Sequence, residues 1–380
     1  MVSRTRTRAR HGSQEARAKL KGCRVVTTSM TARLLIRNQL QSLDEVDWTV
    51  VSGDSYNDPP EGIKVEVVPI RREFAASDLV AFVRLLRFFR SARFDVVQTH
   101  TPKASFLGLP AARLSGSVAI YTIHGSLFFA GNGRLANALG WMFEKWCSSW
   151  ATQVVVQSRQ DEKALPRALI CSARKLSYVG NGIDLDRFTQ PVAPLKPLEN
   201  ERPVVLMVSR LVREKGCVDF LRVAHTLAGR AEFVHVGPFE HDQSDALSES
   251  EVAAAQNEGT VNFIGGVDDV RPYLAAADLV VLPSYREGIP RAAMEAAASG
   301  RAVVAYDIRG VREVIQPETG LLVPRGDTVA LEKKVASLLD DPEGREELGR
   351  RCRAHVIDGF SEDAVVARLR TLYARVARHP

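Results

Sequence analysis

The sequence has few cysteines and no long apolar run, and both absences narrow the kinds of protein it can be. Its five cysteines are scattered without Cys-x-x-Cys spacing, so we expect a reducing compartment and no structural metal. No stretch approaches 18 consecutive uncharged apolar residues, the length that a membrane-spanning helix needs. The Arg-rich start leads into a strand-like segment rather than a secretory apolar region. We therefore expect a cytoplasmic protein.

Excess charge is also missing from most of the chain. The formal net charge is +6, and residues 1–22 carry all of it, with seven Lys or Arg and one acid. The remainder balances 44 basic against 44 acidic residues, so we expect no nucleic-acid partner for the body of the protein. We expect residues 1–22 to be a disordered basic arm. It either contacts an anionic surface, such as the inner face of the membrane, or is simply a solvated tail.

Short β-rich apolar runs alternate with helical patterns from Arg24 onward, beginning with a strand expected at residues 25–28. This alternation is typical of parallel βαβ units. Around residues 184–203 four prolines interrupt it, and a second series of strands and helices follows. The pattern predicts an α/β protein with two Rossmann-like, doubly wound domains facing across a cleft. We expect the following division: arm 1–22, N-terminal domain 23–185, linker 186–202, C-terminal domain 203–358, and a helix at 359–380 that packs back towards the N-terminal domain.

The helix predicted over residues 78–91 has two possible interpretations. Its apolar residues recur at helical spacing, and Arg84, Arg87 and Arg90 lie together on the other side. Such a helix either covers a parallel sheet or lies on an anionic bilayer. We favour the sheet, because crossover helices of this kind are the more common case.

The segment LVVLPSYREGIPRAAMEAAASG has the features of a phosphate-binding loop. It predicts a buried strand at 279–282, a loop, and a helix with Pro290 in its first turn. The free amides at the start of that helix, including Gly288 and Ile289, can hold a diphosphate without a metal. Glu287 and Glu295 carry carboxylates, which accept hydrogen bonds from sugar or ribose hydroxyls. Two acids beside a helix start can equally be dipole complements or solvated side chains.

Two cations are expected at the same edge of the C-terminal sheet. Arg210 and Lys215 follow the first strand of that domain in VSRLVREKG. They would stabilise the negative charge that develops on a leaving diphosphate. The alternative for Arg210 is an ordinary surface ion pair.

In the N-terminal half, polar residues follow two predicted strands. His100, Thr101 and Lys103 come after FDVVQT, and His124 follows VAIYTI. Because strand-to-helix loops line the cleft, we expect these residues on the acceptor side, with His124 hydrogen-bonding a sugar or transferring a proton. A lone histidine is also often a purely structural residue.

With these residues in place, the chain resembles the family 4 retaining glycosyltransferases of the GT-B fold, from Arg24 almost to its end. The resemblance rests on SRLVREKG, EGIPRAAME, FIGGVDDVRPYLAAADLVVLPS and TGLLVPRGD. It implies that Arg210 and Lys215 bind the donor diphosphate and that Glu295 holds the ribose. It also implies that Glu287 contacts the transferred sugar and that His124 is the cleft histidine. It further implies retention of anomeric configuration without a conventional covalent intermediate, and no metal or other cofactor.

HTPKASFLGLPAARLSG followed by YTIHG is similar to a subgroup that builds bacterial surface polysaccharides. This resemblance implies a hexose or N-acetylhexosamine donor, with UDP as the default nucleotide, and a glycan or lipid-linked acceptor. The residues at 27–31 replace the Gly-rich loop of many relatives. Two alternatives stay open on the same fold: a nucleotide-sugar 2-epimerase, and a non-catalytic module that senses nucleotide sugars.

Overall fold

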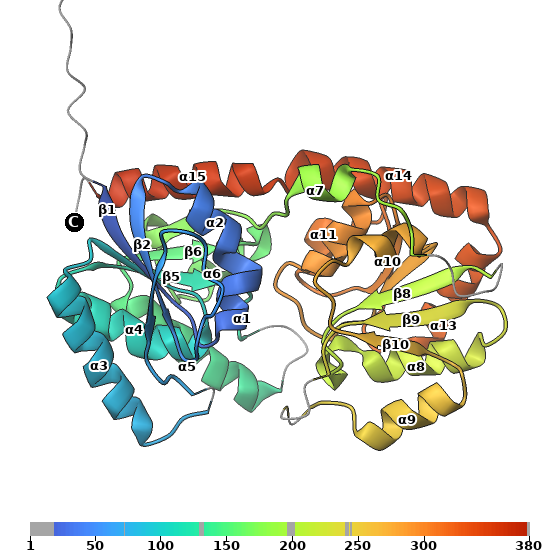
Figure 1. Cartoon of the computed structure of the whole chain (residues 1–380), viewed down its shortest axis with the longest axis horizontal. Helices are drawn as coiled ribbons and strands as arrows, with labels where there is room; N and C mark the ends of the chain where they lie inside the picture. The colour runs from blue at the N-terminus through green and yellow to red at the C-terminus, as the bar shows by residue number, and fades with distance from the viewer. Residues whose placement is uncertain are drawn as a thin grey trace, which may run out of the picture.

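The computed structural model describes residues 19–71, 73–128, 133–195, 202–239, 243 and 245–377. Two α/β domains lie side by side, each with a parallel sheet between layers of helices (Figure 1). Most of the predicted basic arm, residues 1–18, lies outside the described part. Its predicted end at residue 22 is wrong, because β1 (Leu20–Val25) already begins at Leu20 and pairs with β2 there.

The N-terminal sheet has seven parallel strands in the order β3-β2-β1-β4-β5-β6-β7. Apolar β-branched residues dominate its centre, as expected for strands covered on both faces. The first strand lies earlier than predicted, since Thr28 caps the helix α1 that follows and so ends the extended segment. The strands are β1, β2 (Val46–Ser52), β3 (Lys64–Val67), β4 (Val96–Thr99), β5 (Val118–Ile123), β6 (Gln153–Val156) and β7 (Leu176–Tyr178).

Helices cover both faces of this sheet. One core joins the strands to α3 (Ser77–Ala92), α4 (Pro102–Ser115), α5 (Arg134–Trp150) and α6 (Arg159–Arg167). Ala81, Leu85 and Phe89 of α3 are buried in it, so the interpretation of α3 as a sheet-covering helix is correct. The other face packs against the π-helical turn η1 (Ala32–Ile36), α2 (Arg37–Ser42) and the C-terminal helix α15 (Glu362–Val376). The short helix α1 (Ser29–Thr31) precedes η1. A short 3-10 turn, η2 (Ala173–Lys175), precedes β7.

The C-terminal sheet has six parallel strands in the order β10-β9-β8-β11-β12-β13. Its core contains Leu279, Val281, Val303 and Val304, all fully buried. The strands are β8 (Val204–Val208), β9 (Glu232–Val236), β10 (Asn262–Gly265), β11 (Leu279–Leu282), β12 (Ala302–Tyr306) and β13 (Leu321–Val323). The helical elements are η3 (Arg213–Lys215), α8 (Cys217–Thr226), α9 (Glu249–Asn257), α10 (Arg271–Ala276), α11 (Arg291–Ala298), α12 (Val311–Val314), α13 (Thr328–Leu339) and α14 (Pro342–Gly359).

The end of the chain joins the two domains. The helix α14 packs on the C-terminal domain, and α15 continues back over the N-terminal sheet (Figure 1). Tyr373 of α15 packs edge-on against Trp48, with ring centroids 5.4 Å apart, and accepts a hydrogen bond from the buried Arg24. The predicted boundary of the C-terminal segment at 359 lies three residues too early, because Gly359 still belongs to α14 and α15 begins at Glu362, after its N-cap residue Ser361.

The segment predicted as a linker is partly helical. A short helix, α7 (Leu185–Thr189), forms inside it, capped by Asp184 and anchored by the buried Phe188. The burial of Phe188 supplies the stabilisation that the local pattern does not show. Residues 196–201 of this segment lie outside the described part.

Candidate active site

The loop after β11 and the start of α11 form the half of the candidate site that the sequence predicts to be the donor side. The helix α11 begins at Arg291, with Pro290 as its N-cap residue rather than in its first turn. Ile289 before it is buried, and Asn181 of the N-terminal domain donates to the Ile289 carbonyl at 3.3 Å. The amides at the start of α11 therefore lie where the two domains meet.

Lys215 and Glu287 meet directly in this half of the site. Lys215 Nζ lies 2.7 Å from Glu287 Oε1, and both side chains are largely shielded from solvent. The backbone holds the two loops together, since Tyr285 N donates to the Glu214 carbonyl at 2.9 Å. Gly216 permits this approach, because a Cβ there would lie 1.9 Å from the Pro283 carbonyl oxygen and the backbone has φ +78°.

The remaining donor-side residues lie at the same edge of the sheet. Arg210 follows the end of β8 and is half-buried. Glu295 lies on α11 beside Arg291, whose Nε is 3.5 Å from Glu295 Oε1. Burial raises the pKa of Glu295, and the nearby Arg291 guanidinium partly offsets this rise. The two predicted carboxylates thus have different partners in the structure, Lys215 for Glu287 and Arg291 for Glu295.

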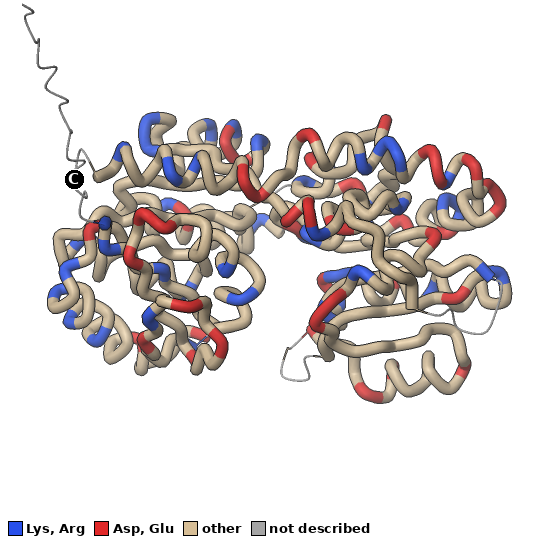
Figure 2. The backbone as a smooth tube through the Cα atoms, turned by 45° about the horizontal axis from the view of Figure 1, so that its top comes forward, with Lys and Arg blue, Asp and Glu red and all other residues tan. Residues whose placement is uncertain are grey.

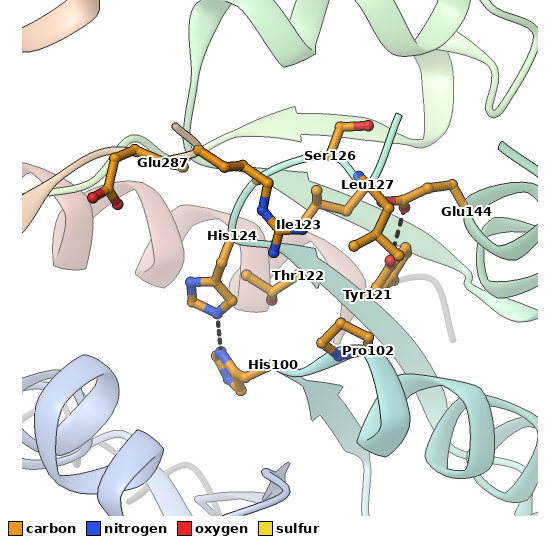
Figure 3. A pocket seen from close by; sticks show the side chains of 13 residues that line it. His100, Pro102, Tyr121, Thr122, Ile123, His124, Ser126, Leu127, Glu144 and Glu287 are labelled. Atoms are coloured by element: carbon orange, nitrogen blue, oxygen red, sulfur yellow. Dashed lines mark hydrogen bonds between the residues drawn. The ribbon is translucent and has the colours of Figure 1, made fainter. Parts of the chain in front are cut away.

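Two histidines form the facing half of the site, at the ends of β4 and β5, with His100 buried and His124 half-buried. His100 Nδ1 lies 3.2 Å from His124 Nε2 (Figure 3). His124 Nδ1 lies 3.1 Å from Gln157 Oε1. With the Gln157 oxygen as acceptor, His124 carries its proton on Nδ1 and His100 donates to His124 Nε2. His100 Nε2 is then left buried without a hydrogen-bond partner among the described residues.

Burial keeps both imidazoles neutral. It lowers the pKa of His124 to about 4, with the Gln157 hydrogen bond opposing the shift in part. Burial also lowers the pKa of His100 well below its usual range, and the buried Arg24 adds to the effect. Both rings therefore act as hydrogen-bonding groups rather than as cations near neutral pH.

The two halves touch through glycine. A Cβ at Gly288 would lie 1.6 Å from the His124 carbonyl oxygen, so only glycine lets the donor loop reach this strand end. Beside this contact lies a cavity of about 150 Å³. Its lining includes His100, His124, Glu144 and Glu287 (Figure 3). Residues predicted from separate halves of the sequence thus line one cavity.

Two predicted acceptor-side residues have internal partners instead. Lys103 is buried, and its Nζ lies 2.5 Å from Asp78 Oδ2 and 2.7 Å from the Glu73 carbonyl oxygen. Thr101 Oγ1 accepts from the Thr27 amide at 3.1 Å and so fixes the loop after β1. In this structure Lys103 and Thr101 hold loops of the N-terminal domain in place.

The sequence did not reveal three groups that shape the site. Glu144 of α5 lines the cavity, accepts from Tyr121 Oη at 2.7 Å, and has its pKa raised to about 7 by burial. Asp161 and Arg309 form an ion pair between the domains. The one sequence signal for a buried Glu144 is that it is the single acidic residue in the largely apolar run WMFEKW.

Glu313 of α12 also reaches across to the N-terminal domain. Its carboxylate accepts from the amides of Arg159 and Gln160, at 3.0 and 2.9 Å, at the start of α6. A carboxylate there satisfies two free amides and complements the helix dipole.

Two further structural features concern metals and membranes. Within the described ranges, no three or more His, Cys, Asp or Glu side chains are grouped as a metal site would require. None of the helices described is both long and apolar enough to cross a bilayer.

Comparisons with known proteins assign the two domains. Residues 31–187 match the family model of Glycosyltransferase Family 4, and residues 202–341 match that of Glycosyl transferases group 1. The chain is 25% identical over 366 residues to the capsular polysaccharide biosynthesis glycosyltransferase CapM of Staphylococcus aureus, covering 92% of this chain and 95% of that protein.

A second relative and a solved structure are also glycosyltransferases or share their fold. The N,N'-diacetylbacillosaminyl-diphospho-undecaprenol alpha-1,3-N-acetylgalactosaminyltransferase of Campylobacter jejuni is 27% identical over 357 residues, covering 88% of this chain and 92% of that protein. The fold matches Anabaena HepE, solved in complex with UDP-glucose, with a TM-score of 0.76, 18% identity, and coverage of 93% of this chain and 100% of that one. The chain is therefore a glycosyltransferase of the GT-B fold, composed of a family 4 domain and a group 1 domain.

Proposed function

We propose that this enzyme transfers a hexose or N-acetylhexosamine from a UDP-sugar, with retention of configuration, to a hydroxyl of a glycan or lipid-linked acceptor. The reaction would take place at the cytoplasmic side of the membrane during surface polysaccharide synthesis. The observation that carries this proposal is the Lys215–Glu287 ion pair beside the start of α11, facing His124 across the contact at Gly288.

The Lys215–Glu287 ion pair is consistent with a binding site for an anionic donor. Lys215 and Glu287 compensate each other's charge, with Lys215 Nζ 2.7 Å from Glu287 Oε1. An arriving diphosphate would take over Lys215, and Arg210 and the free amides of α11 would bind its other oxygens. Cations held there stabilise the charge that grows on the leaving diphosphate, which is the part played by a metal ion in other transferases. The proposal therefore includes no metal requirement.

The same exchange would release Glu287 to bind the transferred sugar. Its carboxylate can then accept hydrogen bonds from two sugar hydroxyls. On the facing side, neutral His124 would accept a hydroxyl hydrogen bond at Nε2 when a sugar displaces His100 from that atom. Glu295, one to two turns into α11, would hold the ribose.

The named relatives support the substrate classes. CapM acts in capsular polysaccharide biosynthesis, and the Campylobacter jejuni enzyme is named for an acceptor linked to diphospho-undecaprenol. HepE was solved with UDP-glucose. These names favour a UDP-sugar donor and a lipid-linked acceptor over the other choices.

Thermal unfolding with nucleotides tests the donor site directly. We expect UDP to raise the melting temperature more than GDP or ADP does, with and without a chelator. Slow hydrolysis of individual UDP-sugars, followed by NMR, then identifies the sugar, and the product anomer reports retention. Conversion of the donor to its 2-epimer without acceptor would instead establish the epimerase alternative. Loss of all activity under the chelator would overturn the metal-free mechanism.

A further inference from the structure

The helix α5 exposes an apolar stripe on the outer side of the N-terminal domain. Its members are spaced by four, three and four residues, which places them on one helix face. Their exposed fractions are too large for core residues: Leu135 75%, Leu139 57%, Met142 60% and Trp146 43%.

The other side of α5 is the one that packs on the sheet. Gly140, Glu144, Cys147 and Ser148 are buried there. The stripe is therefore a second apolar surface of the same helix, and no described part of the chain covers it. A helix that only covers a sheet needs one apolar face, so this second apolar surface is not explained by packing within the domain.

Aromatic contacts extend the stripe across the helix layer. Trp146 lies 5.8 Å from Phe106 of α4, and Phe106 lies 5.1 Å from Phe74, measured between ring centroids. Phe74 precedes α3 and is 64% exposed. The apolar surface thus runs from α5 past α4 to the loop before α3, and we call this surface the α5 face.

The helices around the α5 face have one sign of exposed charge. All residues of α3, α4 and α5 are described, and none of them is an exposed Asp or Glu, since Asp78 pairs with Lys103 and Glu144 is buried. Lys and Arg recur along this layer (Figure 2). Its exposed cations are Arg84, Arg87, Arg90, Arg113, Arg134 and Lys145.

We propose that the α5 face docks on an anionic lipid bilayer, with the apolar stripe in the headgroup region and the surrounding cations against lipid phosphates. This combination of apolar and cationic groups is what a peripheral membrane surface requires. A second copy of the chain fits less well, because the two cationic layers would face each other. A nucleic acid would leave the aliphatic side chains without a partner.

The role that we infer for this docking, access to a lipid-linked acceptor, rests on the proposed function. Glu144, on the inner side of α5, lines the cavity that His124 and Glu287 also line. Docking through the outer side would therefore hold that cavity near the membrane surface, where a lipid-linked acceptor resides.

Vesicle sedimentation of the full chain tests the α5 face without any substrate. We expect binding to phosphatidylcholine vesicles that contain phosphatidylglycerol, and about tenfold weaker binding to phosphatidylcholine alone. The double variant Leu135→Glu/Leu139→Glu should lose about tenfold in affinity for the mixed vesicles. Its melting temperature should not change, because both side chains are exposed.

A matched control separates this face from general surface effects. Val329→Glu alters an equally exposed apolar side chain, 60% exposed, on α13 of the other domain, and should bind vesicles like the wild type. Equal binding by the α5 double variant would overturn the proposal, as would concentration-dependent dimerisation that the double variant abolishes. Vesicle binding needs no UDP-sugar, so its failure would leave the transferase proposal intact, and the reverse also holds.

Discussion

The two domains organise their facing edges in opposite ways. In the C-terminal domain, ion pairs dominate the edge: Lys215 with Glu287, Arg291 with Glu295, and Arg286 with Glu214. In the N-terminal domain, the edge is a chain of neutral hydrogen bonds through His100, His124 and Gln157. Both edges are formed by the loops that follow the carboxyl ends of parallel strands. The fold alone therefore does not explain why one edge is charged and the other neutral.

Under the proposed function, the two edges have different chemical roles in one reaction. Mobile charges suit a leaving diphosphate, whose negative charge increases during reaction. Neutral, buried groups suit sugar hydroxyls, because a charged imidazole would be costly to bury there. Four experiments test this difference between the two edges.

The largest effect should come from the charged edge. Lys215→Ala removes the cation beside the leaving group, so we expect turnover to fall by about 100- to 1000-fold. Transfer rates at saturating donor measure this, with Lys333→Ala on the exposed surface of α13 as the control. A rate near that of the wild type would show that charge does not organise the donor side.

The neutral histidines of the N-terminal edge should make the free energy of unfolding depend on pH. The pKa of His124 is about 4 in the folded protein, below its unfolded value, so the folded state binds fewer protons between about pH 4 and 6.5. The free energy of unfolding should therefore fall as the pH drops through this range, by about 3 kcal/mol from His124.

Urea unfolding at several pH values checks this dependence. The His124→Gln variant should lose less stability on acidification than the wild type, whereas His225→Gln, at an exposed position, should match the wild type. An unchanged pH slope in His124→Gln would mean that the pKa of His124 is the same in the folded and unfolded states.

A smaller effect should follow from separating the two edges. In Gly288→Ala the new methyl group meets the His124 carbonyl, so the donor loop must move back. We expect kcat/KM to fall about tenfold, because misplaced reacting groups are less well oriented. Gly359→Ala, where a Cβ meets nothing within 4 Å, serves as the control. Unchanged kcat/KM would show that this contact is not used in the reaction.

The smallest effect should come from the carboxylate that joins the domains. Glu313→Gln keeps the hydrogen-bond acceptor but removes the charge at the start of α6. We expect a loss of about 0.5–1 kcal/mol in the free energy of unfolding, reduced by added salt. An effect independent of salt would argue against a charge–dipole role.

Much of the fold follows from local patterns in the sequence. Each of the thirteen described strands lies in or beside an apolar run that could be recognised beforehand. The clearest runs belong to strands such as β5, β11 and β12, because burial on both faces requires continuous apolar residues. The misplaced first strand and the unforeseen α7 depend on a cap at Thr28 and on burial of Phe188. Neither is visible in hydrophobic periodicity.

Some features of the candidate site could be predicted from the sequence, and others could not. Positions after strands, such as His124, Arg210 and Glu287, could be placed at the sheet edges because parallel strands end together. The ion pair of Lys103 could not be predicted, because its partner Asp78 lies on a different helix. The pairing of His100 with His124 likewise depends on neighbouring strands β4 and β5.

Local sequence patterns were enough to predict two βαβ domains, the sheet edge of the candidate site, and the residue types available there. These depend on periodicity and on short-range order, which a single chain segment contains. The pairing of charges, the neutrality of the histidines and the exposed face of α5 became visible in the folded structure alone. Those outcomes depend on burial and on distances between residues far apart in the chain, and both exist only once the domains have packed.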